Sequence, residues 1–271
     1  MKKGQVSLFI IIGIVILIAI GGIVFYQKNQ TDQLVNQKTN NPQIQTTPFD
    51  TSALQFFITQ CLQHVEEDAL IRIGSQGGFD TVTVPSVFYY SNVLKIPLYF
   101  NATDHEENIP TQNKIEQELE MYVTRNFQNS CDVLKISENG LDVQTGELQT
   151  TQILSRENVK VTIEYPLIIT KNNVQTKLHF FSATIPTRIL EMYEESKSII
   201  EDTKKESMCI SCTADWALQN QFIVAHDENI LSGTNVISIR DQTKVIQGQM
   251  QVFTFALTSQ TRKANGQWWK W

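Results

Sequence analysis

The first part of the chain is dominated by one long apolar run. From Val6 to Tyr26 no side chain carries a charge. An α-helix needs about 20 such residues to cross the roughly 30 Å hydrocarbon layer of a bilayer. A cleaved secretory signal has an apolar core of only about 7–15 residues, and this run is longer and ends in Phe25 and Tyr26. The pattern therefore predicts a transmembrane helix over residues 6–26.

The charges beside this run predict its orientation. Lys2 and Lys3 precede the helix, and positively charged flanks stay on the cytoplasmic side. Residues 1–26 then comprise a short cytoplasmic stub and the helix. We expect a single-pass protein of the cell membrane, held in the lipid bilayer through residues 6–26, with its C-terminal domain outside the cell.

A polar segment follows the apolar run. Residues 27–48 are mostly Gln, Asn and Thr, with Pro42 and Pro48 and few apolar side chains. Such a segment buries too little surface to offset the entropy of ordering, so we interpret it as a flexible linker. By random-coil scaling its ends lie on the order of 25 Å apart.

Three later segments carry apolar residues at steps of three and four, the period of an amphipathic helix. They cover residues 49–75, 111–129 and 189–206. Gly77 and Gly78 follow the first segment and are typical of a helix end. Residues 49–271 are therefore expected to contain about three amphipathic helices that pack against another layer.

Strand patterns supply that layer. Residues 159–170 and 174–185 are expected to pair as a hairpin, because Lys171-Asn172-Asn173 between them includes Asn, which tolerates positive φ, and residues 159–165 alternate between apolar and polar with a period of two. Further strands are expected at residues 81–85, 88–90 and 94–100, and in the sequences NQFIVAH, NVISIRD and QVFTFALT. Helices grouped between strand blocks predict an α+β extracytoplasmic domain with antiparallel sheets. It is either one domain or two lobes with a break near residues 135–140.

The charge of the chain narrows the classes of partner. The formal net charge is −6, and it becomes about −8 once the two N-terminal lysines are assigned to the cytoplasm. An acidic exterior favours neither nucleic acid binding nor a polybasic lipid patch. We expect no nucleic acid partner.

The cysteines are the main candidates for chemistry. An even number of cysteines in an oxidising compartment favours disulfides, and three pairings are possible. We favour Cys61 with Cys131 and Cys209 with Cys212. The first pair would close a loop of about 70 residues, worth about 4 kcal/mol in the chain-entropy model. The second would be a tight local bridge.

The sequence MCISC also has the spacing of a redox pair, and this alternative stays open. Thioredoxin-like motifs start a helix directly after a buried strand, whereas here the motif follows the charged segment ESKSIIEDTKKES. Zinc would need two further ligands, and neither the other cysteines nor the histidines are spaced to supply them. No nucleophile motif or phosphate-binding loop occurs. We therefore expect no catalytic residue, no metal and no cofactor.

Two other features point to an exported chain. Asn29 and Asn101 each lie in an N-x-T sequence, the acceptor pattern for N-glycosylation. Trp268, Trp269 and Trp271 follow a polar stretch at the end of the sequence. They are candidates for packing on the domain, for contact with the membrane interface, or for contact with a partner.

The sequence KGQVS, directly before the apolar run, resembles the class III signal of archaeal pilin-like proteins. The resemblance implies that a prepilin peptidase cuts between Gly4 and Gln5, with Gln5 and Ser7 matching the pattern. The fifth residue of the mature chain is usually Glu in that class, and here it is Phe9. The alternative is that Lys2 and Lys3 only set the topology of a permanent anchor.

A second resemblance covers most of the chain. The sequences TQCLQHVEEDALIRIGSQGGF, VKVTIEYPLIIT and MCISC, with the later strands VISIRD and VFTFAL, are similar to a family of uncharacterised membrane-anchored surface proteins of small-genome archaea. The resemblance implies no activity. We expect a non-enzymatic binding or structural role in the envelope or in a pilin-like assembly. The alternative is an extracytoplasmic thiol-disulfide oxidoreductase or another enzyme.

Overall fold

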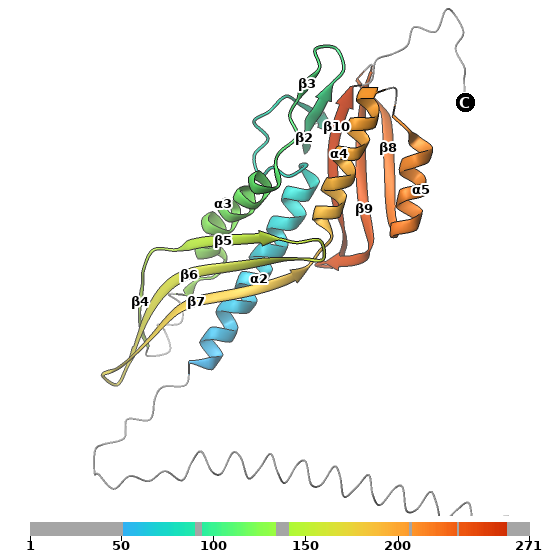
Figure 1. Cartoon of the computed structure of the whole chain (residues 1–271). Coiled ribbons are helices and arrows are strands. Elements are labelled where there is room, and N and C mark those ends of the chain that lie inside the picture. Colours follow the sequence, from blue (N-terminus) through green and yellow to red (C-terminus); the bar gives the residue numbers. More distant parts are fainter. Residues whose placement is uncertain (1–50, 90–93, 134–140, 206–207, 232, 259–271) are drawn as a thin grey trace, which may run out of the picture. The chain divides into compact units, whose positions relative to one another are not determined.

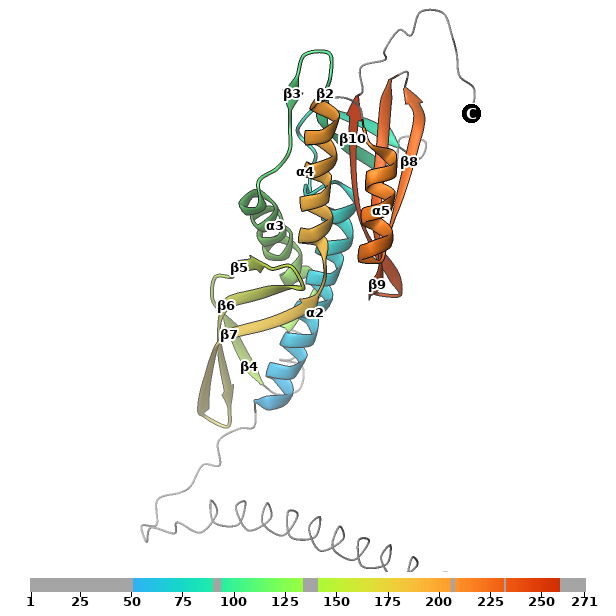
Figure 2. The same cartoon turned by 45° about the vertical axis from the view of Figure 1, so that its right-hand side comes forward.

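The computed structural model describes residues 51–89, 94–133, 141–205, 208–231 and 233–258. These residues form an α+β arrangement, as expected (Figures 1 and 2). The predicted transmembrane helix, the linker and the segment near residues 135–140 lie outside the described residues. Among the residues that are described, no helix has both the length and the apolar character needed to cross a bilayer.

The three predicted helices are confirmed within a few residues at their ends, and the structure adds a fourth. The added helix is short and begins inside the MCISC motif, where no helix was expected. The described helices are α2 (Ser52–Ser75), α3 (Gln112–Ser130), α4 (Ile189–Lys205) and α5 (Ile210–Asn220).

The larger of two sheets has six strands in the order β1-β2-β10-β9-β8, with β3 paired to β2. Neighbouring strands are antiparallel except β2 and β10, which run parallel over a short stretch. The strands are β1 (Ser86–Tyr89), β2 (Leu94–Asn101), β3 (Glu106–Glu107), β8 (Phe222–Leu231), β9 (Thr234–Ile246) and β10 (Gln249–Thr258).

The prediction of a strand at residues 81–85 is wrong. Residues 81–85 form bends instead of a ladder. The carbonyl of Val82 accepts a hydrogen bond from Nζ of Lys95 at 2.6 Å, so this backbone group is satisfied by a side chain. The β-branched composition of the segment reflects a single buried residue, Val82, and not a strand face.

The smaller sheet has four strands built around β6. Strand β7 pairs along one edge of β6, and β4 and β5 share the other edge, each at one end of it. The expected hairpin is confirmed, and Asn172 and Asn173 have φ of 51° and 66°. The alternate residues of β6 are buried, as predicted. The strands are β4 (Asp142–Thr145), β5 (Gln149–Leu154), β6 (Asn158–Lys171) and β7 (Val174–Pro186).

Helix α2 belongs to both parts of the core. It packs against α3, against β7 of the smaller sheet and against β10 of the larger one. Ile58 and Leu62 in its first half and Ile73 in its last turn are fully buried. Both views in Figures 1 and 2 show α2 running from the smaller sheet to the larger one.

Gly74 and Gly77 let the end of α2 approach the backbone of β10. Gly77 has φ +54°, and Gly78 donates its N–H to the carbonyl of Ile73 at 2.8 Å, which ends the helix in a Schellman motif. A Cβ on Gly74 would clash with the carbonyl oxygen of Val252. The sequence GSQGG is therefore a helix end that needs close backbone packing.

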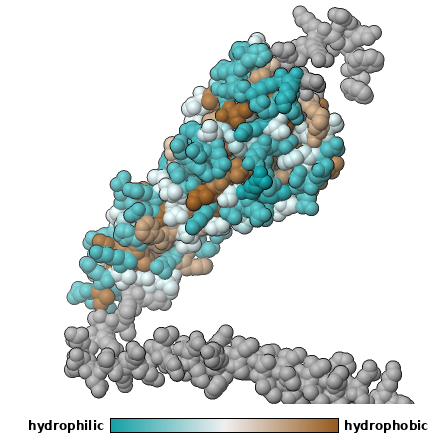
Figure 3. All heavy atoms as spheres, viewed as in Figure 1, coloured by the Kyte–Doolittle hydropathy of each residue, from teal (hydrophilic) through white to brown (hydrophobic). Residues whose placement is uncertain are grey.

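The other face of the larger sheet carries a second, small apolar cluster. Val87 and Ile96 from the β1–β2 hairpin pack there against Val236 of β9 and Ala256 of β10. We call this side of the sheet the hairpin face. Figure 3 shows one side of the molecule, where hydrophilic residues cover most of the described surface and apolar residues gather in separate patches.

Candidate functional site

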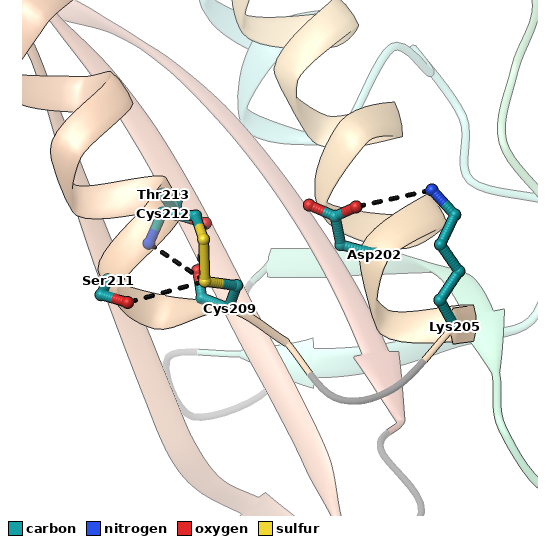
Figure 4. Close-up of a disulfide and its surroundings, with 6 residues drawn as sticks. All are labelled: Asp202, Lys205, Cys209, Ser211, Cys212 and Thr213. Carbon is teal, nitrogen blue, oxygen red and sulfur yellow. Dashed lines mark hydrogen bonds and ion pairs between the residues drawn. A yellow bond between two sulfur atoms is a disulfide. The ribbon is translucent and has the colours of Figure 1, made fainter.

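The Cys209–Cys212 disulfide lies at the start of α5, close to the end of α4 (Figure 4). Cys209 is the N-cap residue of α5, and its Sγ accepts a hydrogen bond from the backbone N–H of Cys212 at 3.2 Å. The hydroxyl of Ser211 lies 3.6 Å from the same sulfur. Cys212 is exposed, whereas Cys209 is partly buried. The two sulfurs therefore differ in access and in hydrogen bonding.

The helix start favours negative charge at Cys209. The free N–H groups of the first turn give a helix N-terminus a partial positive charge, which stabilises a thiolate. The first turn of α5 contains no acidic residue that would oppose this effect. On α4, Asp202 forms an ion pair with Lys205 at 3.8 Å, so this nearby carboxylate is partly compensated (Figure 4).

An apolar hollow of about 360 Å³ adjoins this disulfide. It lies between α5, the end of α4 and the strands β8 and β9. Its rim includes Ile210, Leu218 and Ile223, which are 56%, 78% and 39% exposed. Ile210 is the residue after Cys209, so the hollow begins directly beside the disulfide.

A stack of side chains holds α5 on the larger sheet. The ring of Trp216 lies parallel to that of Phe222, with centroids 4.8 Å apart. The guanidinium of Arg188 lies 3.9 Å from the centroid of the Phe222 ring and donates two hydrogen bonds to the carboxylate of Asp241. Burial raises the pKa of Asp241, but the hydrogen bonds from Arg188 and Thr243 outweigh it, and the net pKa is lowered.

The second disulfide has a different environment. Cys61 in α2 is joined to Cys131, which follows the last residue of α3, with Cα atoms 5.8 Å apart. Cys131 is 1% exposed. This bridge ties two helices of the core together and offers no accessible sulfur at Cys131. Both pairings agree with the favoured connectivity, and among the described cysteines none is free.

The other predicted site residues are spread over the chain. Asn101 is the last residue of β2, and its side-chain amide donates to Asp104 at 2.9 Å. Gly4, Gln5 and Asn29, like the three C-terminal tryptophans, lie outside the described residues. Within the described ranges no group of His, Cys, Asp and Glu residues is arranged to hold a metal ion.

Helix α5, which carries the disulfide, was not predicted from the sequence. Ile210, Ala214, Ala217 and Leu218 are spaced as one helical face, but the whole helix has only 11 residues. The hollow could not be anticipated, because its other wall comes from β8 and β9. Comparison with known proteins adds no relative, since no family model, no curated protein and no solved structure matches the chain.

Proposed function

We propose that this chain is a membrane-anchored cell-surface protein with a non-enzymatic binding or structural role in the envelope or in a pilin-like assembly. The observation that carries the proposal is the pair of disulfides in a domain that follows a predicted membrane span. Disulfides persist on the oxidising side of a membrane and are rare in the reducing cytoplasm. A buried bridge between two core helices supports a stable scaffold outside the cell.

The orientation can be tested on intact cells. Added protease should release the domain and leave the anchor, with the first cuts in the predicted linker, residues 27–48. An antibody to the domain would follow its loss from the cells. A cytoplasmic protein serves as the control for lysis. Protection of the whole chain in unpermeabilised cells would contradict the proposed orientation.

The state of the N-terminus separates the two forms of the proposal. The mass of the N-terminal peptide from natively extracted protein gives the answer. A chain that begins at Gln5 would show cleavage by a prepilin peptidase and favour a pilin-like subunit. A chain that retains Lys2 and Lys3 would be a permanently anchored surface protein.

A second candidate function is thiol-disulfide exchange at Cys209 and Cys212. The position of Cys209 at a helix N-cap, beside an apolar hollow, is the specific observation that favours it. An incoming substrate thiolate would attack the exposed sulfur of Cys212. Cys209 would leave as a thiolate, stabilised by the N–H of Cys212 and by the helix start.

Completion of this exchange requires a second substrate thiol. Its thiolate attacks the substrate sulfur of the mixed disulfide and releases Cys212 as a thiolate. The substrate dithiol is thereby oxidised to a disulfide, and the Cys209–Cys212 pair is reduced by the same two electrons. The hollow would hold apolar side chains of the substrate next to the reacting sulfurs.

The two candidates differ in how the Cys209–Cys212 bridge responds to reductant. An exchange catalyst should be reduced reversibly between about −180 and −270 mV, whereas a structural bridge should resist reduction to below about −300 mV. Cys61–Cys131 is the internal control in the same molecule. If the bridge is structural, the Cys209→Ser variant should have a lower melting temperature and should lose no thiol-disulfide exchange activity. Lost exchange with unchanged melting would instead establish the second candidate.

A further inference from the structure

Arg240 differs from the other described arginines. Arg72, Arg125, Arg156 and Arg188 each have a carboxylate oxygen within 2.6–3.3 Å. The side chain of Arg240 has no ion pair or hydrogen bond with any described residue. It is nonetheless partly buried, on β9. In a chain with a formal net charge of −6, this guanidinium is a cation that has no partner among the residues that the structure describes.

Arg240 lies on the hairpin face, between two hollows. In β9 it is on the same side as Ser238 and Val236, since side chains two residues apart share a face. Tyr89, Ser238 and Arg240 line both hollows, which have volumes of about 480 and 280 Å³. The three side chains therefore form a boundary shared by two adjoining spaces.

The two hollows differ in charge. The larger one is also lined by Asp227, whose carboxylate accepts a hydrogen bond from the hydroxyl of Tyr89 at 3.3 Å. The described wall of the smaller one contains no acidic residue, and adds Ser75 and Thr254 to the shared residues. Arg240 lines both hollows, and the carboxylate of Asp227 in the larger one makes the smaller hollow the more favourable place for an anionic group.

The polar groups around Arg240 are mostly hydroxyls. The Oγ atoms of Ser238 and Thr254 lie 3.2 Å apart, on neighbouring strands, and both face the smaller hollow. A guanidinium presents its N–H groups as a planar fork that matches the two oxygens of a carboxylate. Desolvating such a cation without an acceptor is unfavourable, and an external carboxylate would restore the missing hydrogen bonds.

We propose that the smaller hollow binds the carboxylate of a small hydroxylated ligand of the sugar-acid class, with Arg240 as the bidentate donor. The hydroxyls of Ser238 and Thr254 bind beside the carboxylate. The neutral part of the ligand extends past Tyr89 into the larger hollow, where Asp227 accepts hydrogen bonds from its hydroxyl groups. This proposal rests on the proposed binding role, whose ligand class it names.

The test is calorimetric titration of the full-length protein in detergent micelles with D-glucuronate. We expect saturable one-to-one binding, with D-glucose binding at least tenfold more weakly. Arg240→Gln should weaken glucuronate binding at least tenfold, because it removes the charge-assisted pair. Arg156→Gln is the matched control, since Arg156 is an exposed arginine on a surface ion pair, and it should bind glucuronate normally.

Several outcomes would overturn the proposal. These are the absence of saturable glucuronate binding by the wild type, equal binding of glucose, equal binding of inorganic sulfate, and full binding by folded Arg240→Gln. The comparison of glucuronate with glucose uses only the wild type, so it holds if the variant does not fold. The titration does not depend on orientation in the membrane, and protease accessibility on cells tests that orientation separately.

Discussion

Glu66 is a carboxylic acid in the middle of the core. Its side chain on α2 is fully buried, and Oε2 accepts a hydrogen bond from Nε2 of Gln152 at 2.6 Å. Burial raises the pKa of Glu66 to about 8, although the hydrogen bond from Gln152 lowers it in part. Oε1 of both residues has no partner among the described residues. Protonation gives Glu66 a hydroxyl donor that an ionised carboxylate lacks.

The buried acid predicts a stability that falls as the pH rises. The unfolded chain loses this proton near pH 4.5, whereas the folded chain keeps it until about pH 8. The contribution of protonated Glu66 to the free energy of unfolding is therefore fully present below pH 4.5 and is lost as the pH rises to about 8. The loss is about 3 kcal/mol between pH 5 and pH 7.5. Glu66→Gln keeps a neutral hydrogen-bonding pair with Gln152 and should remove this decrease.

Urea denaturation of both proteins at pH 5 and pH 7.5 measures the effect. The free energy of unfolding of Glu66→Gln should increase relative to that of the wild type as the pH rises. Glu147→Gln is the control, because Glu147 is exposed and should leave the pH profile unchanged. Parallel pH profiles for Glu66→Gln and the wild type would show that Glu66 is ionised in the fold.

The elements that the sequence predicted well are those with a long, regular pattern. Helices α2, α3 and α4 each bury a full face, and the β6–β7 hairpin combines strict alternation with an asparagine turn. Strands β4 and β5 are short and polar and exist because they pair with β6, so their own residues carry little signal. The strand predicted at residues 81–85 is wrong because the β-branched residues there have no partner strand, although their own composition favours a strand.

The end of α2 gives a prediction about element packing. Gly77→Ala would place a methyl group 2.7 Å from the carbonyl oxygen of Thr254 and 2.8 Å from Pro97, at φ +54°. Left-handed strain and the clash together should reduce the free energy of unfolding by about 2–4 kcal/mol. Gly248→Ala has φ +77° but open space around it, so it should lose only about 1 kcal/mol. Equal losses in chemical denaturation would show that the contact with β10 contributes nothing.

At the level of the whole molecule, long-range pairing was the least predictable property. The favoured cysteine pairing agrees with the structure, although the expected helices alone do not place Cys61 and Cys131 near each other. The position of β10 between β2 and β9 could not be anticipated, since strand order depends on contacts between distant segments. The isolation of Arg240 was hidden for the same reason. The isolation of Arg240 depends on which carboxylates the fold places too far away to form an ion pair with it.

The shared role of α2 predicts that both sheets lose protection together. Replacing Cys61 and Cys131 by alanine should cost about 4 kcal/mol, because the bridge closes a loop with a sequence separation of 70. Amide exchange should then accelerate in β4–β7 and in β8–β10 alike. Replacing Cys209 and Cys212, which are three residues apart, should cost about 2 kcal/mol. Faster exchange confined to β4–β7 would mean that the two sheets unfold independently.

Strand β10 is the last described strand in the chain, yet it lies inside the larger sheet. Synthesis delivers the N-terminal end first, so β2 is complete at Asn101 long before β10 begins at Gln249. Until then both β2 and β9 have an open edge, of the kind that pairs with other chains. β10 thus acts as the closing strand of the fold. A copy that stops before residue 249 would expose two adhesive edges at once, which makes arrested chains of this protein targets for proteases and chaperones.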